Sequence, residues 1–146
     1  MYATAAAHLP HPLAAVSAAV LAGAADPVAW FPALHHRDDR PLDELGARLE
    51  LVLPVPGGAT HVPLEVTDVV RTTVTARGRT DAGDDVCLRL SLSPWNGGTA
   101  VVVSIDAGDE PRPLLSWSLT RRLEAALGRL AGQLAAHGSA VAPARP

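Results

Sequence analysis

The sequence predicts an α+β fold in which a curved antiparallel sheet of about six or seven strands surrounds a long C-terminal helix. Three observations support this prediction. Apolar and polar residues alternate through most of residues 47–106, as they do in strands with one buried face. Turn-forming residues divide this stretch into short runs. A stripe of leucines at helical spacing then closes the chain.

The length and composition suit one domain with one core. The chain has 146 residues, and 48% of them are hydrophobic. We expect a single domain over residues 1–138. Residues 139–146 are rich in Ala and Pro, and we expect them to form a disordered tail.

The first 34 residues predict one strand and two short helices. A strand over Tyr2–Leu9 would stop at Pro10 and Pro12, since proline cannot donate to a ladder. Pro12 then suits the first turn of a helix over residues 12–21. Asp26 and Pro27 are the cap and first residue expected of a second helix, over residues 26–34.

Residues 35–45 are polar and predict a loop, after which the period changes to two. Pro56-Gly57-Gly58, the stretch 81–85 and Asn96-Gly97-Gly98 are turn signals, the last of them typical of a hairpin. Each predicted strand has one dry face and one wet face. The dry faces are expected to hold the following side chains: Leu49, Leu51, Leu53, Val55, Val62, Leu64, Val66, Val70, Val74, Ala76, Val86, Leu88, Leu90, Leu92, Val101, Val103 and Ile105.

The final helix is expected over residues 114–137, with Gly138 as its C-terminal cap. Its leucine stripe comprises Leu115, Leu119, Leu123, Leu127, Leu130 and Leu134. Gly128 and Gly132 lie away from this stripe. Their small-residue face is compatible with a partner helix, as in a homodimer, and equally with solvent.

Charge and cysteine content exclude several classes of protein. The formal net charge is −3, and no basic stripe interleaved with aromatic residues suggests a nucleic-acid partner. No apolar run approaches the roughly 20 residues that a membrane span needs. Cys87 is the single cysteine, so no intramolecular disulfide forms. A cytoplasmic protein is the simplest interpretation.

The order of the motifs resembles the START-like, or SRPBCC, superfamily with its helix-grip fold, which includes polyketide cyclase/dehydrase-like proteins. Three stretches carry the resemblance: His8-Leu9-Pro10-His11-Pro12 followed by Asp26-Pro27-Val28-Ala29-Trp30-Phe31-Pro32, then Leu45-Gly46-Ala47-Arg48-Leu49, and finally Leu92-Ser93-Pro94-Trp95-Asn96-Gly97-Gly98-Thr99-Ala100-Val101. With the terminal helix, it covers nearly the whole chain. The resemblance implies a deep apolar cavity between sheet and helix, with the Trp30 segment at its mouth.

The dry strand faces are almost wholly aliphatic, so an apolar or aromatic small molecule fits this wall best. An ordinary filled core without a ligand is the alternative. Trp30 supplies stacking surface, although it is equally suited to filling the core. The predicted ligand-binding residues are Trp30, Phe31, Thr4, Leu51, Leu64, Val66, Leu90, Val103, Leu119 and Leu123.

Polar groups for catalysis are few. Tyr2 and Thr4 share parity with His8 and could add hydroxyl anchors. His8 suits acid–base chemistry near neutral pH if it faces the cavity, although a surface role is the preferred alternative. Asp68 shares parity with the dry residues Leu64 and Val66, which would place a carboxylate on an apolar face and raise its pKa. A bulge that turns Asp68 outward is the preferred alternative. The catalytic candidates are therefore His8, Asp68 and Tyr2.

We expect no cofactor. The cluster His35-His36-Arg37-Asp38-Asp39 holds metal-ligand side chains, but no further His lies at a recognised spacing, so a solvated loop is the better interpretation. The leading hypothesis is a cofactor-free cyclase or dehydratase acting on a polyketide-like substrate in secondary metabolism, such as antibiotic biosynthesis. The alternatives are a non-catalytic carrier of a lipid, quinone or polyketide, and a module that binds a partner through the last helix.

Overall fold

The computed structural model describes residues 1–21 and 30–141, with the backbone alone for residues 137–141. Its elements are β1 (Tyr2–Leu9), α1 (Leu13–Val20), β2 (Leu34–His36), β3 (Arg48–Val55), β4 (Gly58–Val70), β5 (Thr73–Arg79), β6 (Asp85–Trp95), β7 (Gly98–Ala107) and α2 (Pro113–Val141). The strands form one antiparallel sheet of seven in the order β1-β7-β6-β5-β4-β3-β2. The fold class predicted from the sequence is confirmed.

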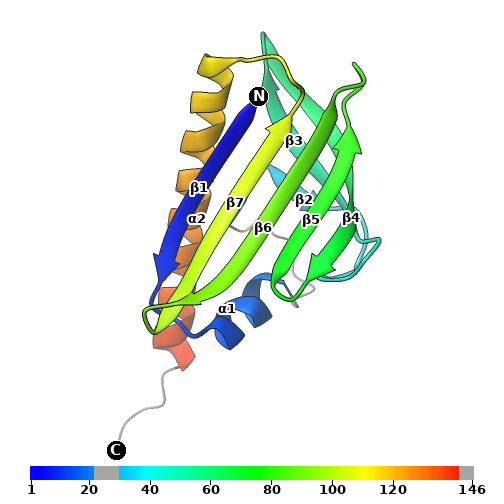
Figure 1. Cartoon of the computed structure of the whole chain (residues 1–146). Coiled ribbons are helices and arrows are strands. Elements are labelled where there is room, and N and C mark those ends of the chain that lie inside the picture. Colours follow the sequence, from blue (N-terminus) through cyan, green and yellow to red (C-terminus); the bar gives the residue numbers. More distant parts are fainter. Residues whose placement is uncertain (22–29, 142–146) are drawn as a thin grey trace, which may run out of the picture.

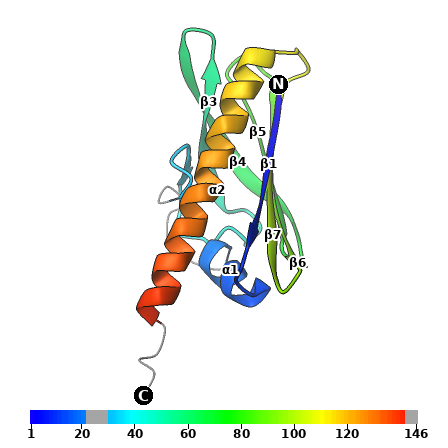
Figure 2. The same cartoon turned by 90° about the vertical axis from the view of Figure 1, so that its left-hand side faces the viewer.

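The sheet curls, and α2 lies along its open side (Figure 1). Figure 2 shows α2 crossing in front of the sheet, with β1 on one side of the helix and β3 on the other. This arrangement follows from the leucine stripe, whose members Leu119, Leu123, Leu127, Leu130 and Leu134 are buried. Each large apolar side chain buried in this way contributes about 1.5–3 kcal/mol.

The hairpin turns form where the sequence predicted them. Asn96 and Gly97 adopt positive φ angles of 47° and 77°, the conformation of a type I′ turn between β6 and β7. Gly57 has a φ of 83° in the turn between β3 and β4. The twist of a type I′ turn matches that of the flanking strands, so the Asn96-Gly97 turn supports the observed register of β6 and β7.

Two helix predictions need correction. α2 continues through Gly138 to Val141, so Gly138 does not end it. A glycine within a helix weakens it without necessarily terminating it. The second short helix was expected over residues 26–34, of which residues 26–29 lie outside the described part. Residues 30–33 are turn and irregular backbone, and Leu34 begins β2.

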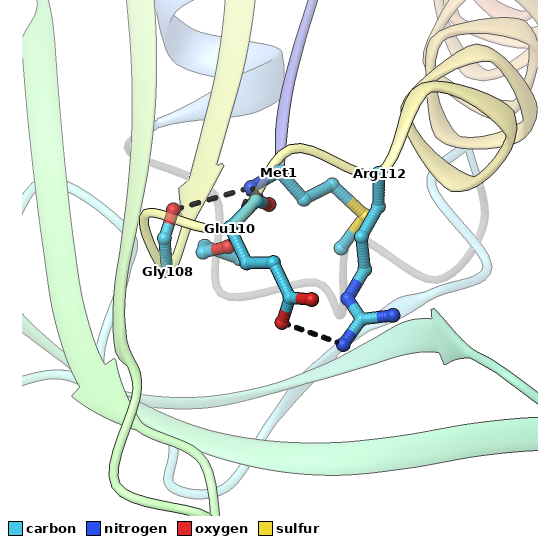
Figure 3. Close-up of polar contacts among 5 residues, drawn as sticks. Met1, Gly108, Glu110 and Arg112 are labelled. Carbon is cyan, nitrogen blue, oxygen red and sulfur yellow. Dashed lines mark hydrogen bonds and ion pairs between the residues drawn. The ribbon is translucent and has the colours of Figure 1, made fainter.

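The loop between β7 and α2 folds back on the first residue of the chain (Figure 3). The amino group of Met1 donates hydrogen bonds to the carbonyl oxygens of Ala107, Gly108 and Glu110 at 2.8, 3.1 and 3.2 Å. The Glu110 carboxylate forms an ion pair with Arg112 at 2.9 Å. These contacts tie β1 to the start of α2.

Within the described part of the chain, no helix has the length and apolar character needed to cross a membrane.

Candidate functional site

A small apolar cavity lies between the inner face of the sheet and residues 30–42. Its volume is about 20 Å³, which is room for one water molecule. The lining comprises Trp30, Phe31, Leu34, Leu42, Leu49, Val74, Ala76, Leu88, Leu90 and Val103. The deep cavity expected from the resemblance is therefore mostly filled by side chains of the described residues.

Cross-strand pairs build the sheet side of this cavity. Val74 of β5 lies opposite Leu90 of β6, and Leu90 in turn lies opposite Val103 of β7. Ala76 lies opposite Leu88 in the same way. Because Ala76 is the shortest side chain of this wall, it leaves space that a Leu or Val would occupy.

Two aromatic side chains cover the cavity opposite the sheet. The ring centroids of Trp30 and Phe31 lie 5.7 Å apart with a 42° tilt, within the range of favourable aromatic contacts. Both are buried. They sit on irregular backbone ahead of β2, where the Phe31 carbonyl accepts a hydrogen bond from the Leu34 amide at 3.0 Å. Neither Trp30 nor Phe31 belongs to a strand ladder.

The predicted apolar ligand residues divide into two groups. Trp30, Phe31, Leu90 and Val103 line the cavity. The others are buried in the core but do not border it: Leu51, Leu64, Val66, Leu119 and Leu123. A buried position on the apolar face of a strand is therefore not enough to predict that a residue lines the cavity.

The polar candidates on β1 lie on the other face of the sheet. Ala3, Ala5 and Leu9 are the buried residues of β1, and Tyr2, Thr4 and His8 alternate with them and are exposed. These three side chains therefore lie on the exposed face of β1 and do not line the cavity.

Two of these side chains form hydrogen bonds to other strands, His8 to the end of β6 and Thr4 to the adjacent strand β7. His8 Nε2 donates to the carbonyl of Trp95 at 2.7 Å. Thr4 Oγ1 shares a hydrogen bond with Ser104 Oγ at 3.2 Å.

Asp68 faces away from the cavity because β4 contains a bulge. Val66 pairs with Ala76, whereas Asp68 pairs with Thr75, so the register shifts between Val66 and Asp68. An extra residue in one strand reverses which side chains face inward. Asp68 is exposed and lies 3.9 Å from the Arg77 guanidinium. The outward bulge that the sequence analysis preferred is the one observed.

Leu34 and His36 were not recognised as site residues. They belong to β2, which lies in the stretch expected to be helix and loop. Leu34 lines the cavity, and His36 pairs with the lining residue Leu49. Both ring nitrogens of His36 are shielded from solvent. This places an imidazole beside the apolar lining.

Glu50, near the β2 edge of the sheet, interacts with two basic side chains. Glu50 of β3 pairs with Arg37 and accepts a hydrogen bond from His61 Nδ1. The His61 hydrogen bond, followed by the positive charge of Arg37, lowers the pKa of the Glu50 carboxyl below its ordinary value. Among the described residues, no group of three His, Cys, Asp or Glu side chains is arranged to hold a metal ion.

The architecture has close structural counterparts. No protein-family model matches the sequence, and neither does any curated protein. DynU16, a protein from the dynemicin biosynthetic locus, matches with a TM-score of 0.66 and 22% identity. The match covers 91% of this chain and 46% of DynU16, so this chain spans about half of that protein.

Two further structures match over nearly their whole length. A START superfamily protein from Mycobacterium smegmatis has 16% identity and a TM-score of 0.62, with 90% of this chain and 95% of that chain covered. Major latex-like protein 151 from Panax ginseng has 10% identity and a TM-score of 0.65, with 91% and 96% covered. The chain therefore has the helix-grip fold of the START-like superfamily. Identities this low concern the fold, and ligand and reaction have to be argued from the site.

Proposed function

We propose that this protein binds a small hydrophobic molecule in the cavity between the sheet and the Trp30–Phe31 cover. The observation that carries the proposal is the wholly apolar and aromatic lining, which retains unfilled space in an otherwise packed core. Such a wall favours an apolar body, since it offers almost no competing polar partner.

The size of the cavity constrains how binding occurs. Its volume of about 20 Å³ lies far below the roughly 300–1,000 Å³ of typical ligand sites. A ligand must therefore displace side chains. Those of Trp30 and Phe31 are the best suited, because their backbone belongs to no strand, whereas the strand residues are held by ladders on both sides.

A non-catalytic carrier fits the described residues best. The acid–base candidates Tyr2, His8 and Asp68 are exposed on the far side of the sheet or at its surface. A polyketide-type cyclase or dehydratase is the second candidate. It is supported by the likeness to a protein from a biosynthetic locus and by the solvent-shielded imidazole of His36 next to Leu49.

Cavity filling tests the binding proposal. The neutral fluorophore N-phenyl-1-naphthylamine is titrated into the wild type, Ala76→Phe and the control Ala59→Phe, whose residue is exposed on β4. We expect the wild type and the control to bind and Ala76→Phe to lose at least about tenfold in affinity, since the added ring occupies the site. Ala76→Val is the milder variant if the larger one unfolds. Absence of binding by the wild type, or full binding by a folded Ala76→Phe, would refute the proposal.

The cyclase candidate is tested separately with His36→Gln and a linear poly-β-ketone thioester. Loss of product formation with unchanged probe affinity supports proton transfer by His36, because only the chemical step needs the imidazole. Failure of the wild type to turn this substrate over favours the carrier.

A further inference from the structure

A second hollow lies on the outside of the molecule, between α2 and the sheet edge. Its volume is about 350 Å³, and it is lined by Phe31, Pro32, Ala33, Val52, Arg122, Ala125 and Arg129. Three of these residues lie on α2, Val52 belongs to β3, and residues 31–33 lead into β2. Figure 2 shows how α2 runs between the β1 side and the β3 side of the sheet. The lining residues place the groove beside α2 on the β3 side.

Phe31 belongs to the linings of both the outer groove and the inner cavity. Its side chain is only 2% exposed. The ring therefore forms part of the partition between the two spaces. Phe31 lies on irregular backbone, so a change in the position of its side chain does not require a strand to unpair.

The groove combines an apolar floor with two positive charges. Arg122 and Arg129 are exposed and seven residues apart, which puts them two turns apart on the same side of the helix, about 10 Å along its axis. Within the described residues, neither guanidinium is engaged by a carboxylate in an ion pair. Arginine presents a planar fork of donors that suits a carboxylate.

We propose that this groove is the entrance to the cavity, that Phe31 is its gate, and that the ligand is an amphipathic acid whose carboxylate is held by Arg122 and Arg129. This inference rests on the proposed function, because the apolar end of the ligand would bind in the cavity proposed above. The apolar body passes Phe31 into the cavity, and the anionic end stays in the groove at the helix surface.

A matched pair of ligands tests the charge selection. Dodecanoate and dodecanol, both as free monomers, compete with N-phenyl-1-naphthylamine for the wild type, for Arg122→Gln/Arg129→Gln, and for Arg121→Gln. Arg121 is an exposed arginine of the same helix that contacts the Trp117 ring and does not line the groove.

We expect the wild type and Arg121→Gln to prefer the acid by about three- to tenfold, with the preference falling as salt is added because exposed charges are screened. The double variant should bind both ligands equally and dodecanol as the wild type does. Equal affinity for acid and alcohol in the wild type overturns the inference while leaving apolar binding intact. If the wild type binds neither ligand and no apolar probe, the proposed function itself fails.

The gate is tested by kinetics. Stopped-flow binding of dodecanol should be at least about tenfold faster in Phe31→Ala than in the wild type, and intermediate in Phe31→Leu, which retains more of the core volume. Unchanged association rates in both folded variants overturn the gate.

Anionic lipid headgroups carry the same negative charge as a free carboxylate. Binding to vesicles therefore has to be measured as well. Phosphatidylglycerol vesicles are sedimented with the wild type and the double arginine variant, with phosphatidylcholine vesicles as the reference. Loss of vesicle binding in the variant with unchanged dodecanoate affinity identifies a membrane contact and overturns the proposal.

Discussion

Glu50 is the residue at which charge and fold are most closely linked. It lies on β3 next to the edge strand β2, and its carboxylate joins Arg37 and His61, two residues from different segments. Because these partners lower its pKa, the folded state favours the charged carboxylate. The contribution to stability is therefore present above the ordinary carboxyl pKa of 4.5 and is lost as the pH falls through the lowered value.

Replacing Glu50 with Gln should remove this pH dependence. We expect the melting temperature of Glu50→Gln to lie below that of the wild type at neutral pH and the gap to narrow on acidification below pH 4.5, because protonation of the wild type removes the same charge. Thermal unfolding followed from neutral pH to about pH 3 measures this. Glu124→Gln, on the exposed side of α2, is the control. A constant gap across the range would contradict the assignment.

Single residues also mark the limit of what the sequence predicts. The alternation on β1 correctly grouped Tyr2, Thr4 and His8, but with alanines at most of the other positions it did not indicate which face is buried. On β4 strict parity would place Asp68 on the dry face, but a bulge inserts one residue and turns it outward, as the preferred alternative had it. Both outcomes removed polar candidates from the site.

At the scale of elements, β4 and β5 approach closely at Gly78. A Cβ atom there would lie 2.0 Å from the carbonyl oxygen of Pro63. Gly78→Ala should therefore push the strands apart and lower the free energy of unfolding by about 1–3 kcal/mol. Gly58→Ala is the control, because a Cβ atom at that position would have no neighbouring atom within 4 Å. Urea unfolding compares the two, and equal stabilities would show that the strands can separate at no cost.

The two faces of α2 should respond differently to the same substitution. Leu123 is 1% exposed and Leu114 is 82% exposed. Leu123→Ala should lower the free energy of unfolding by about 2–5 kcal/mol through a lost contact and a cavity. Leu114→Ala should stay within about 0.5 kcal/mol of the wild type. A similar loss in both variants, measured by urea unfolding, would mean that the outer face of this helix is also covered in solution.

Long elements were predictable and the short one was not. β1 has the predicted bounds, and β3 buries the predicted dry residues Leu49, Leu51 and Leu53, because eight residues give enough periods to recognise a strand. β2 has three residues, too few for any period, and its pairing with β3 depends on tertiary contacts. As a result Leu34, which lines the cavity, could not be identified from the sequence.

At the scale of the whole molecule, the helix-grip arrangement explains why the fold was easier to predict than the site. The fold needs only apolar faces on the sheet and on α2. The regular spacing of apolar residues in the sequence predicts both faces. The cavity depends on the volume left when all side chains have packed, to which Ala76 and the Trp30–Phe31 cover contribute. The resemblance predicted a deep apolar cavity between the sheet and the long helix. The observed cavity is smaller, and among the described residues its lining includes none from α2.

The different exposure of the three tryptophans allows ligand entry to be followed by fluorescence. Trp30 is 6% exposed at the cavity, whereas Trp95 and Trp117 are 61% and 66% exposed at the surface. In Trp95→Phe/Trp117→Phe, the emission of Trp30 should be blue-shifted and poorly quenched by iodide, and dodecanol should change both, because the cover must move to admit it. Trp30→Phe, which retains the two surface tryptophans, should show no such response. If Trp30 is insensitive to a ligand that binds by competition, the ligand occupies another surface and the cover stays closed.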